Sequence, residues 1–401
     1  MFRNDATVPH GLWRSLTYLF YLSVFFPYVG VANIGTDTQP LSLILGIVIL
    51  FMSWKDFNFP MEIWIFLLPF FCAIVLLVPS GFSFDALRSI GGYASLFILS
   101  AASYCVSIKS VQLSDKLFNS IVYIWLVVGL IQLFFNNQFM VAIIGDIRTT
   151  ASRGVTSLAP EPSHYGIMCV FLLFFGYLRS TRKWIMLLLV VQIVILSRSF
   201  LAVLLLFAFW FYRTIIFASL RTVLLSLIVV FAAVIAVDYM DVFFQGQRVL
   251  SLLKLIIQNP ILIFTRDASA NSRFLHIILP VWGFLKAFGL PHGFGQWEEF
   301  IISNRSFYKD ILVRIGPGRI MSTYGASLFE LGVFGLLIPG GIGLALWKRF
   351  KKTKKVFLVL SLIIHTILLT QVPLAFPPLA YFIGYVAAYE QKDRQATPLA
   401  L

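Results

Sequence analysis

The chain has 401 residues, of which 59% are hydrophobic and only 12% are charged. This composition excludes an ordinary water-soluble protein and is typical of a polytopic membrane protein. The formal net charge is +14. The sequence has no soluble module with a basic stripe and stacking aromatics, so nucleic acid is not an expected partner.

Apolar runs recur along the whole chain and predict an all-α integral membrane protein with about twelve transmembrane helices. The first run is interpreted as an uncleaved span rather than a signal peptide. No cofactor or metal is expected, since the three cysteines lie inside apolar runs without pairing or metal-ligand spacing. The expected spans are 15–32, 41–54, 61–79, 88–108, 117–135, 164–178, 184–197, 199–212, 220–237, 323–347, 356–372 and 376–390.

The charges of the loops predict the orientation of these spans. Loops on one side carry most of the lysines, including the segment KRFKKTKK at 348–355, whereas the short loops on the other side carry arginine and no lysine. The positive-inside rule therefore places both termini in the cytoplasm. The expected parts are a transmembrane bundle at 1–237 with a short hairpin at 184–212, a large outer loop at 238–322, and C-terminal transmembrane helices at 323–401.

The short outer loops carry four arginines, Arg88, Arg148, Arg153 and Arg198. The planar fork of a guanidinium group binds phosphate or diphosphate in a bidentate manner. This bias toward arginine therefore indicates a site for an anionic substrate on the outer side.

The stretch SLAPEPSHYG at 157–166 places one glutamate between two prolines in one of these outer loops. Pro160 and Pro162 restrict the backbone, and Ser163 is expected to cap a helix that begins near His164. Glu161 then either acts on the substrate, as a base or an acceptor ligand, or only favours the helix dipole.

Two apolar segments of about 13 residues, 184–196 and 200–212, flank a Ser-Arg-Ser tip and predict a short helical hairpin. At about 1.5 Å per residue each segment rises only about 20 Å, less than the roughly 30 Å of a hydrocarbon core. Arg198 on the tip is therefore expected below the outer surface, lining a polar cavity. The alternative is that its long side chain snorkels to the interface.

The outer loop at 238–322 is too long for an unstructured connection and predicts a small helical cap. Within it, Asn271 or Ser272 is expected to cap a helix whose first turn contains Arg273, with His276 on the same face. These groups would present a phosphate site beside a titratable side chain, or the helix would only contact lipid headgroups. Farther along, Arg305, Arg314 and Arg319 form either a groove wall for an anionic chain or a solvated basic surface.

The order of these motifs resembles that of the bacterial O-antigen polymerase and ligase superfamily, over about residues 145–340. The motifs are Glu161-Pro162-Ser163, the tip Ser197-Arg198-Ser199, the Ser269, Ser272 and Arg273 element, Trp282 with the Gly293-Phe294-Gly295 turn, and the Glu-Leu-Gly-Val-Phe-Gly run that begins at Glu330.

This resemblance implies a GT-C-like membrane glycosyltransferase with a helical periplasmic cap in the bacterial inner membrane. Its donor and acceptor would be glycans carried on undecaprenyl diphosphate, joined without a metal into O-antigen or exopolysaccharide at the periplasmic face. Arg198 and Arg273 match the two arginines that engage the donor diphosphate in the family. The implied partners are membrane lipids, a chain-length regulator protein and a flippase.

The ligase branch of the family carries a histidine where this chain has Met321-Ser322-Thr323-Tyr324, and the Glu-Pro-Ser element resembles polymerases, so a polymerase is expected and a ligase is the alternative. A transporter is less favoured, because no internal repeat is visible. The expected catalytic residues are Glu161, Arg198 and Arg273. The expected substrate-binding residues are Arg148, Arg153, His164, Arg198, Arg273, His276, Arg305, Arg314 and Arg319. Asp146, Asp238, Asp241, Asp267, Glu298, Glu299, Asp310, Glu330 and His292 are further candidates for the base.

Overall fold

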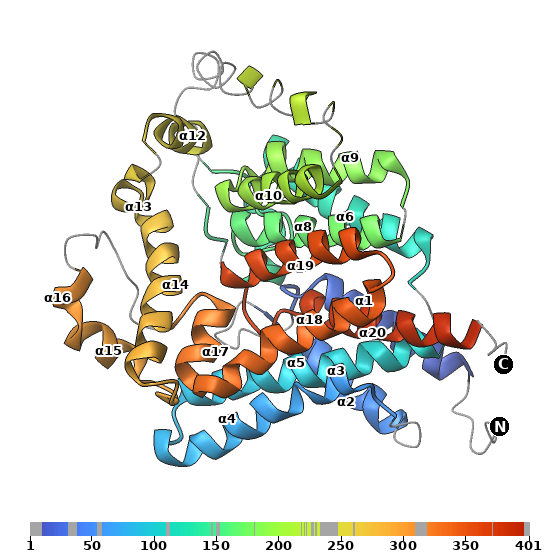
Figure 1. Cartoon of the computed structure of the whole chain (residues 1–401). Coiled ribbons are helices and arrows are strands. Elements are labelled where there is room, and N and C mark those ends of the chain that lie inside the picture. Colours follow the sequence, from blue (N-terminus) through green and yellow to red (C-terminus); the bar gives the residue numbers. More distant parts are fainter. Residues whose placement is uncertain are drawn as a thin grey trace.

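The structure is a computed structural model in which every regular element of the described residues is helical (Figure 1). This confirms the all-α prediction. The described residues are 10–30, 38–53, 58–109, 113–145, 147–149, 153–179, 181–217, 219, 221, 223–225, 228, 231–232, 248–259, 261–308, 319–370 and 372–396.

The helices of the N-terminal part are α1 (His10–Phe25), α2 (Leu41–Met52), α3 (Met61–Trp64), α4 (Leu67–Ser80), α5 (Phe84–Ile108), α6 (Asp115–Phe134), α7 (Val141–Ile144) and α8 (Pro162–Leu178). The hairpin contains α9 (Lys183–Val191), a π-helical segment (Gln192–Ser197) and α10 (Phe200–Phe217). The outer loop forms α12 (Arg248–Gln258), α13 (Leu262–Arg266), α14 (Ala268–Lys286), α15 (Trp297–Ser303) and α16 (Arg305–Tyr308). The C-terminal part comprises α17 (Thr323–Leu331), a 3₁₀ segment (Gly332–Leu336), α18 (Leu337–Phe350), α19 (Lys354–Leu369) and α20 (Pro377–Ala396).

Five helical segments within the described residues are long and apolar enough to cross a membrane, which supports a membrane-embedded protein. They are Met61–Ser80, Phe84–Ile108, Asp115–Phe134, Phe200–Phe217 and Thr323–Phe350. Shorter apolar helices cover Leu41–Met52, Pro162–Leu178, Lys183–Ser197 and Pro377–Ala388.

Several helix boundaries differ from the expected spans. The first helix ends at Phe25 rather than near residue 32, because Pro27 disfavours helical backbone at the residue before it. The second helix of the hairpin continues to Phe217, with Arg213 inside the helix and its guanidinium over the ring of Tyr177. Most of the span expected at 220–237 lies outside the described residues.

The long helix α5 packs against α2, α4 and α20. Small side chains make the closest approach possible, because a Cβ atom on Gly384 of α20 would lie 2.2 Å from the carbonyl oxygen of Ser100. Such contacts between small residues are the usual basis of helix association in membranes. They fix the position of α5, whose first turns carry several polar side chains.

The cap helices α12 to α16 lie on one side of the molecule, and the C-terminal end of α20 lies on the opposite side (Figure 1). The cap has a small hydrophobic core of its own, formed by Leu275, Leu279, Trp297, Phe300, Ile301, Tyr308 and Phe329. Phe329 belongs to α17, so this core also attaches the cap to the bundle.

Candidate functional site

The loop that carries the Glu-Pro-Ser element is held in place by one buried amide. The Nε2 atom of Gln132 on α6 donates to the carbonyl oxygens of Phe139 and Ser157, at 2.9 Å each. Its Oε1 atom accepts from the backbone N–H groups of Thr156 and Ser157, at 3.1 and 2.6 Å. Because buried backbone polar groups need such partners, these hydrogen bonds from Gln132 stabilise the loop against α6.

Helix α8 begins at Pro162, earlier than the expected start near His164, and Glu161 rather than Ser163 is the N-cap residue. The side chain of Glu161 makes no capping hydrogen bond. Its Oε1 lies 3.2 Å from Nε of Arg148, and its Oε2 accepts from the Ser163 hydroxyl at 3.1 Å. His164 Nδ1 is 3.9 Å from Oε2. The carboxylate is therefore oriented by its neighbours rather than by the helix terminus.

The tip of the hairpin packs against this same loop. The backbone N–H of Val155 donates to the carbonyl of Leu196 at 2.9 Å, and a Cβ atom on Gly154 would lie 2.0 Å from the Ser197 carbonyl oxygen. The structure thus brings together the regions of Arg198 and Glu161, two of the three predicted catalytic residues. Arg198 has a left-handed backbone (φ 44°), and its Nε donates to the carbonyl of Ile195 at 3.0 Å.

The expected start of the Arg273 helix, with Asn271 or Ser272 as its N-cap, is wrong. Helix α14 begins at Ala268, and its N-cap is Asp267, which accepts from the N–H of Ala270 at 2.8 Å. Arg273 therefore lies beyond the first turn, where the free N–H groups of a helix are found. His276 is fully buried rather than presented beside a phosphate.

His276 is part of the contact between the cap and the bundle. Its Nδ1 accepts from the Met321 N–H at 3.4 Å, and its ring lies 5.5 Å from that of Trp297. Burial, together with the charge of Arg319, lowers the pKa of His276 to about 4. His276 is therefore a neutral, structural side chain at physiological pH.

Acid is expected to weaken this contact. A lowered pKa in the folded state gives stability that is present above the unfolded pKa of about 6.5 and is lost as the pH falls toward about 4. Thermal melting of the purified protein in detergent would therefore show a smaller loss of stability over this range for His276→Phe than for the wild type. Equal losses in the two proteins would contradict the assignment. The hydrogen bond from the Met321 N–H is lost when His276 Nδ1 is protonated, so it is part of the pH-dependent loss expected in the wild type.

A cavity of about 580 Å³ lies where the cap meets the bundle, and it is named the junction cavity here. It is lined by the first turns of α5, the start of α17, the Gly293–Glu298 region of the cap, the segment before α2, and the loop before α20. Of the predicted site residues, His164 and Arg319 line it. Arg88, one of the four arginines expected in the short outer loops, also lines it.

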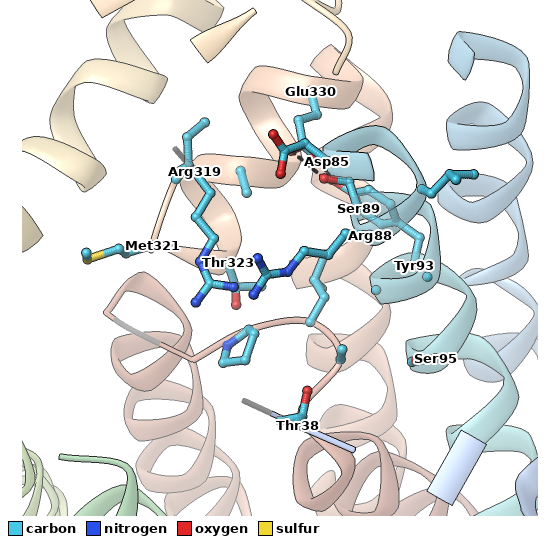
Figure 2. Close-up of a pocket in the computed structure, with 18 of the residues that line it drawn as sticks. Thr38, Asp85, Arg88, Ser89, Tyr93, Ser95, Arg319, Met321, Thr323 and Glu330 are labelled. Atoms are coloured by element: carbon cyan, nitrogen blue, oxygen red, sulfur yellow. Dashed lines mark hydrogen bonds between the residues drawn. The ribbon is translucent and has the colours of Figure 1, made fainter. Parts of the chain in front are cut away.

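Two arginines extend toward each other in this cavity, Arg88 from α5 and Arg319 from the segment before α17 (Figure 2). Arg88 is partly buried, and no acidic side chain among the described residues forms an ion pair with it. Arg319 is exposed and Arg88 is partly buried, so both guanidinium groups can reach an anionic group bound in the cavity. The cavity therefore favours a ligand with at least one phosphate or carboxylate group.

One carboxylate is fixed at the wall of the same cavity. Glu330 Oε1 accepts from the hydroxyl of Ser89 at 3.0 Å, and Oε2 accepts from the hydroxyl of Tyr93 at 2.8 Å (Figure 2). The Glu330 backbone is held as well, since its carbonyl accepts from the N–H of Gly293 at 3.2 Å. The Gly-Phe-Gly turn and the run beginning at Glu330, which are far apart in the sequence, therefore meet at this wall.

The remaining predicted residues lie elsewhere. Arg198 and Arg273 are partly buried, and Arg148, Arg153 and Arg305 are exposed; none of the five lines the cavity. His292 is structural, because its ring stacks on Phe329 at 4.2 Å and its Nε2 lies 3.1 Å from the Gly283 carbonyl oxygen. Arg314, Asp146, Asp238, Asp241 and Asp310 lie outside the described residues.

Ser89 and Tyr93 are absent from the residues expected from the sequence. Their signal is nevertheless present, since they stand four residues apart at the start of an apolar span and therefore share one helix face. Their joint partner Glu330 is remote in the chain, so only the fold assigns them a role. Within the described ranges, no group of three or more His, Cys, Asp or Glu side chains is placed to hold a metal ion.

Comparisons with models of known protein families and with curated protein sequences found no match to the chain. A functional assignment therefore depends on the geometry of the junction cavity and on the order of the sequence motifs.

Proposed function

We propose that this protein is a membrane glycosyltransferase that polymerises oligosaccharide repeat units carried on undecaprenyl diphosphate. The observation that carries the proposal is the pair Arg88 and Arg319, which extend into one cavity that also exposes the fixed carboxylate of Glu330. Such a cavity supplies both requirements of the reaction, cations for a departing diphosphate and an acceptor of protons for an incoming hydroxyl.

The rim of the cavity suits a ligand that is both lipid and anion. Phe84 and Leu87 line the cavity, and their side chains are 62% and 53% exposed. These apolar side chains stand on the same helical turn as Arg88. A polyprenyl diphosphate has this combination of an apolar chain and a charged head. A soluble nucleotide or sugar phosphate has no apolar chain that would contact the exposed apolar rim.

Parts of the motif order that resembles the polymerase and ligase family lie at this cavity, whereas Arg198 and Arg273 do not line it. His164 follows the Glu-Pro-Ser element, Gly293 and Gly295 belong to the cap turn, and Glu330 opens the run after the outer loop. The finer features of the proposal follow that resemblance. They are a GT-C-like fold with about twelve spans, cytoplasmic termini, a periplasmic active site in the bacterial inner membrane, and cooperation with a chain-length regulator and a flippase.

A ligase is the second candidate, since it shares the donor chemistry. The position at which ligases carry a histidine faces the cavity here, because Met321, Ser322 and Thr323 all line it. None of these three side chains is a general base at neutral pH. This observation favours the polymerase.

The proposed polymerase activity is tested with the purified protein in detergent or vesicles. Lipid-linked repeat units are supplied as substrate. A ladder of product lengths on a gel is expected. Transfer of a single glycan to a lipid A-core acceptor, without a ladder, would identify a ligase instead. No transfer to either acceptor would reject both enzyme proposals and leave transport of the lipid-linked glycan to be tested.

A further inference from the structure

Among the described residues, three carboxylates line the junction cavity, but they differ in how they are held. Asp85 and Glu298 are exposed at its rim, whereas Glu330 is partly buried in its wall. An exposed carboxylate is solvated and moves freely, so its position relative to a bound sugar is not defined. Only Glu330 has its carboxylate hydrogen-bonded by side chains of another helix.

The hydrogen bonds place the Glu330 carboxylate from two directions. Ser89 and Tyr93 stand one turn apart on α5, and each donates to a different oxygen of the carboxylate, at 3.0 and 2.8 Å. Tyr93 is itself 1% exposed, so its ring is held by packing. A carboxylate oxygen can accept two hydrogen bonds, so each oxygen retains an acceptor site for a ligand.

The backbone of Glu330 is equally constrained. Gly332, two residues on, has a positive φ of 60°, and a Cβ atom there would lie 2.3 Å from the Gly289 carbonyl oxygen. The chain therefore turns against the cap directly after Glu330, and the N–H of Gly293 binds the Glu330 carbonyl at 3.2 Å. Hydrogen bonds therefore hold both the carboxylate oxygens and the backbone of Glu330. Catalysis of proton transfer requires a pre-organised group of this kind.

We propose that Glu330 is the general base of the transfer reaction and that Ser89 and Tyr93 position it; this inference rests on the proposed function. The Glu330 carboxylate takes the proton of the acceptor sugar hydroxyl as the acceptor oxygen forms a bond to the anomeric carbon of the donor. The bond from that carbon to the diphosphate oxygen breaks, and its electron pair leaves with the lipid diphosphate. The proton on Glu330 then passes to water.

The proposed base, Glu330, is not in contact with the arginines that line the same cavity. The hydroxyls of Ser89 and Tyr93, rather than Arg88 or Arg319, contact the Glu330 carboxylate in the structure. A base in an ion pair with arginine would be a weaker proton acceptor, since a neighbouring cation stabilises the ionised carboxylate. In the proposed function the arginines bind the diphosphate, and the carboxylate of Glu330 acts on the acceptor.

The test compares donor binding with transfer in Glu330→Gln. Glutamine preserves the shape and one acceptor oxygen, so we expect binding of undecaprenyl diphosphate, measured by thermal shift, to stay within about 3-fold of the wild type, while kcat falls by about 10²- to 10⁴-fold. Glu299→Gln is the matched control, because the structure places this residue, a candidate for the base in the sequence, outside the cavity and exposed on α15. Its kcat should be unchanged.

Tyr93→Phe keeps the buried ring and removes only the hydroxyl. We expect it to lower kcat by about 10-fold with little change in KM, whereas a purely structural tyrosine would alter the melting temperature without this selective effect. If Glu330→Gln fails to fold, the two single variants Tyr93→Phe and Glu330→Asp test the proposal instead. Wild-type kcat in both of them would overturn it.

Near wild-type kcat in Glu330→Gln would overturn this inference alone, because the wild type would still transfer glycans. Absence of transfer by the wild type would instead remove the proposed function, and the inference with it. Loss of donor binding by Glu330→Gln would also overturn the inference, since a base for the acceptor has no part in holding the donor.

Discussion

Replacing either arginine of the junction cavity by alanine, Arg88→Ala or Arg319→Ala, is expected to lower kcat/KM for glycan transfer by about 10²- to 10³-fold. The two side chains extend into the same space, and Arg88 has no acidic partner among the described residues. Charge develops on the diphosphate as it leaves, so fixed guanidinium groups stabilise the transition state more than the ground state. The measurement is the rate of ladder formation with purified lipid-linked repeat units.

The matched control for this pair is Arg266→Ala, because Arg266 ends α13 in the cap, is exposed and does not line the cavity. Its rate should equal that of the wild type. Lysine at position 88 or 319 should restore only part of the activity, since an ammonium group lacks the bidentate fork that matches a diphosphate. Wild-type rates in both alanine variants would exclude the junction cavity as the donor site.

The second large effect is expected if the donor diphosphate lies instead where the family resemblance places it, at Arg198 and Arg273, neither of which lines the junction cavity. In that case Arg198→Ala and Arg273→Ala should each abolish transfer while the protein still inserts into the membrane. Arg198 lies on the tip that packs against the loop of Glu161, and Arg273 lies on α14 of the cap. Ladder formation and the amount of protein recovered from the membrane fraction are the two measurements. Near wild-type activity in either variant would show that its arginine does not engage the diphosphate.

A glycine substitution at position 198 distinguishes the effect of losing the side chain from the effect of straining the backbone. Arg198 has a φ of 44°, a conformation that glycine adopts without strain and that alanine does not. Arg198→Gly should therefore be at least as stable to heat as Arg198→Ala, although both lack the guanidinium. If glycine restores activity, the effect of alanine at this position is one of backbone strain, and the proposed contact with the diphosphate is wrong.

Local sequence patterns were sufficient for the class of protein and for much of its organisation. Apolar runs alone predict an all-helical membrane protein, because a bilayer admits little else, and the structure agrees. The segments 164–178 and 323–347 were predicted nearly to their observed ends, since a proline pair and a Ser N-cap mark where those helices begin. The predicted end of a helix was wrong where the helix continues past a charged residue, as α10 continues past Arg213.

The site itself depended on contacts that no local pattern contains. The sequence by itself determined that the short loops opposite the lysine-rich loops carry arginine, and it predicted a cap after the hairpin and a later span with the run that begins at Glu330. Only the tertiary structure decided that Arg88 and Arg319 share a cavity, and that Ser89 and Tyr93 orient Glu330 across 241 and 237 residues of chain. It also showed that His276 is fully buried between the cap and the bundle. The physical reason is that helix type and orientation follow from local hydrophobicity and charge, whereas the meeting of polar side chains follows from how the helices pack.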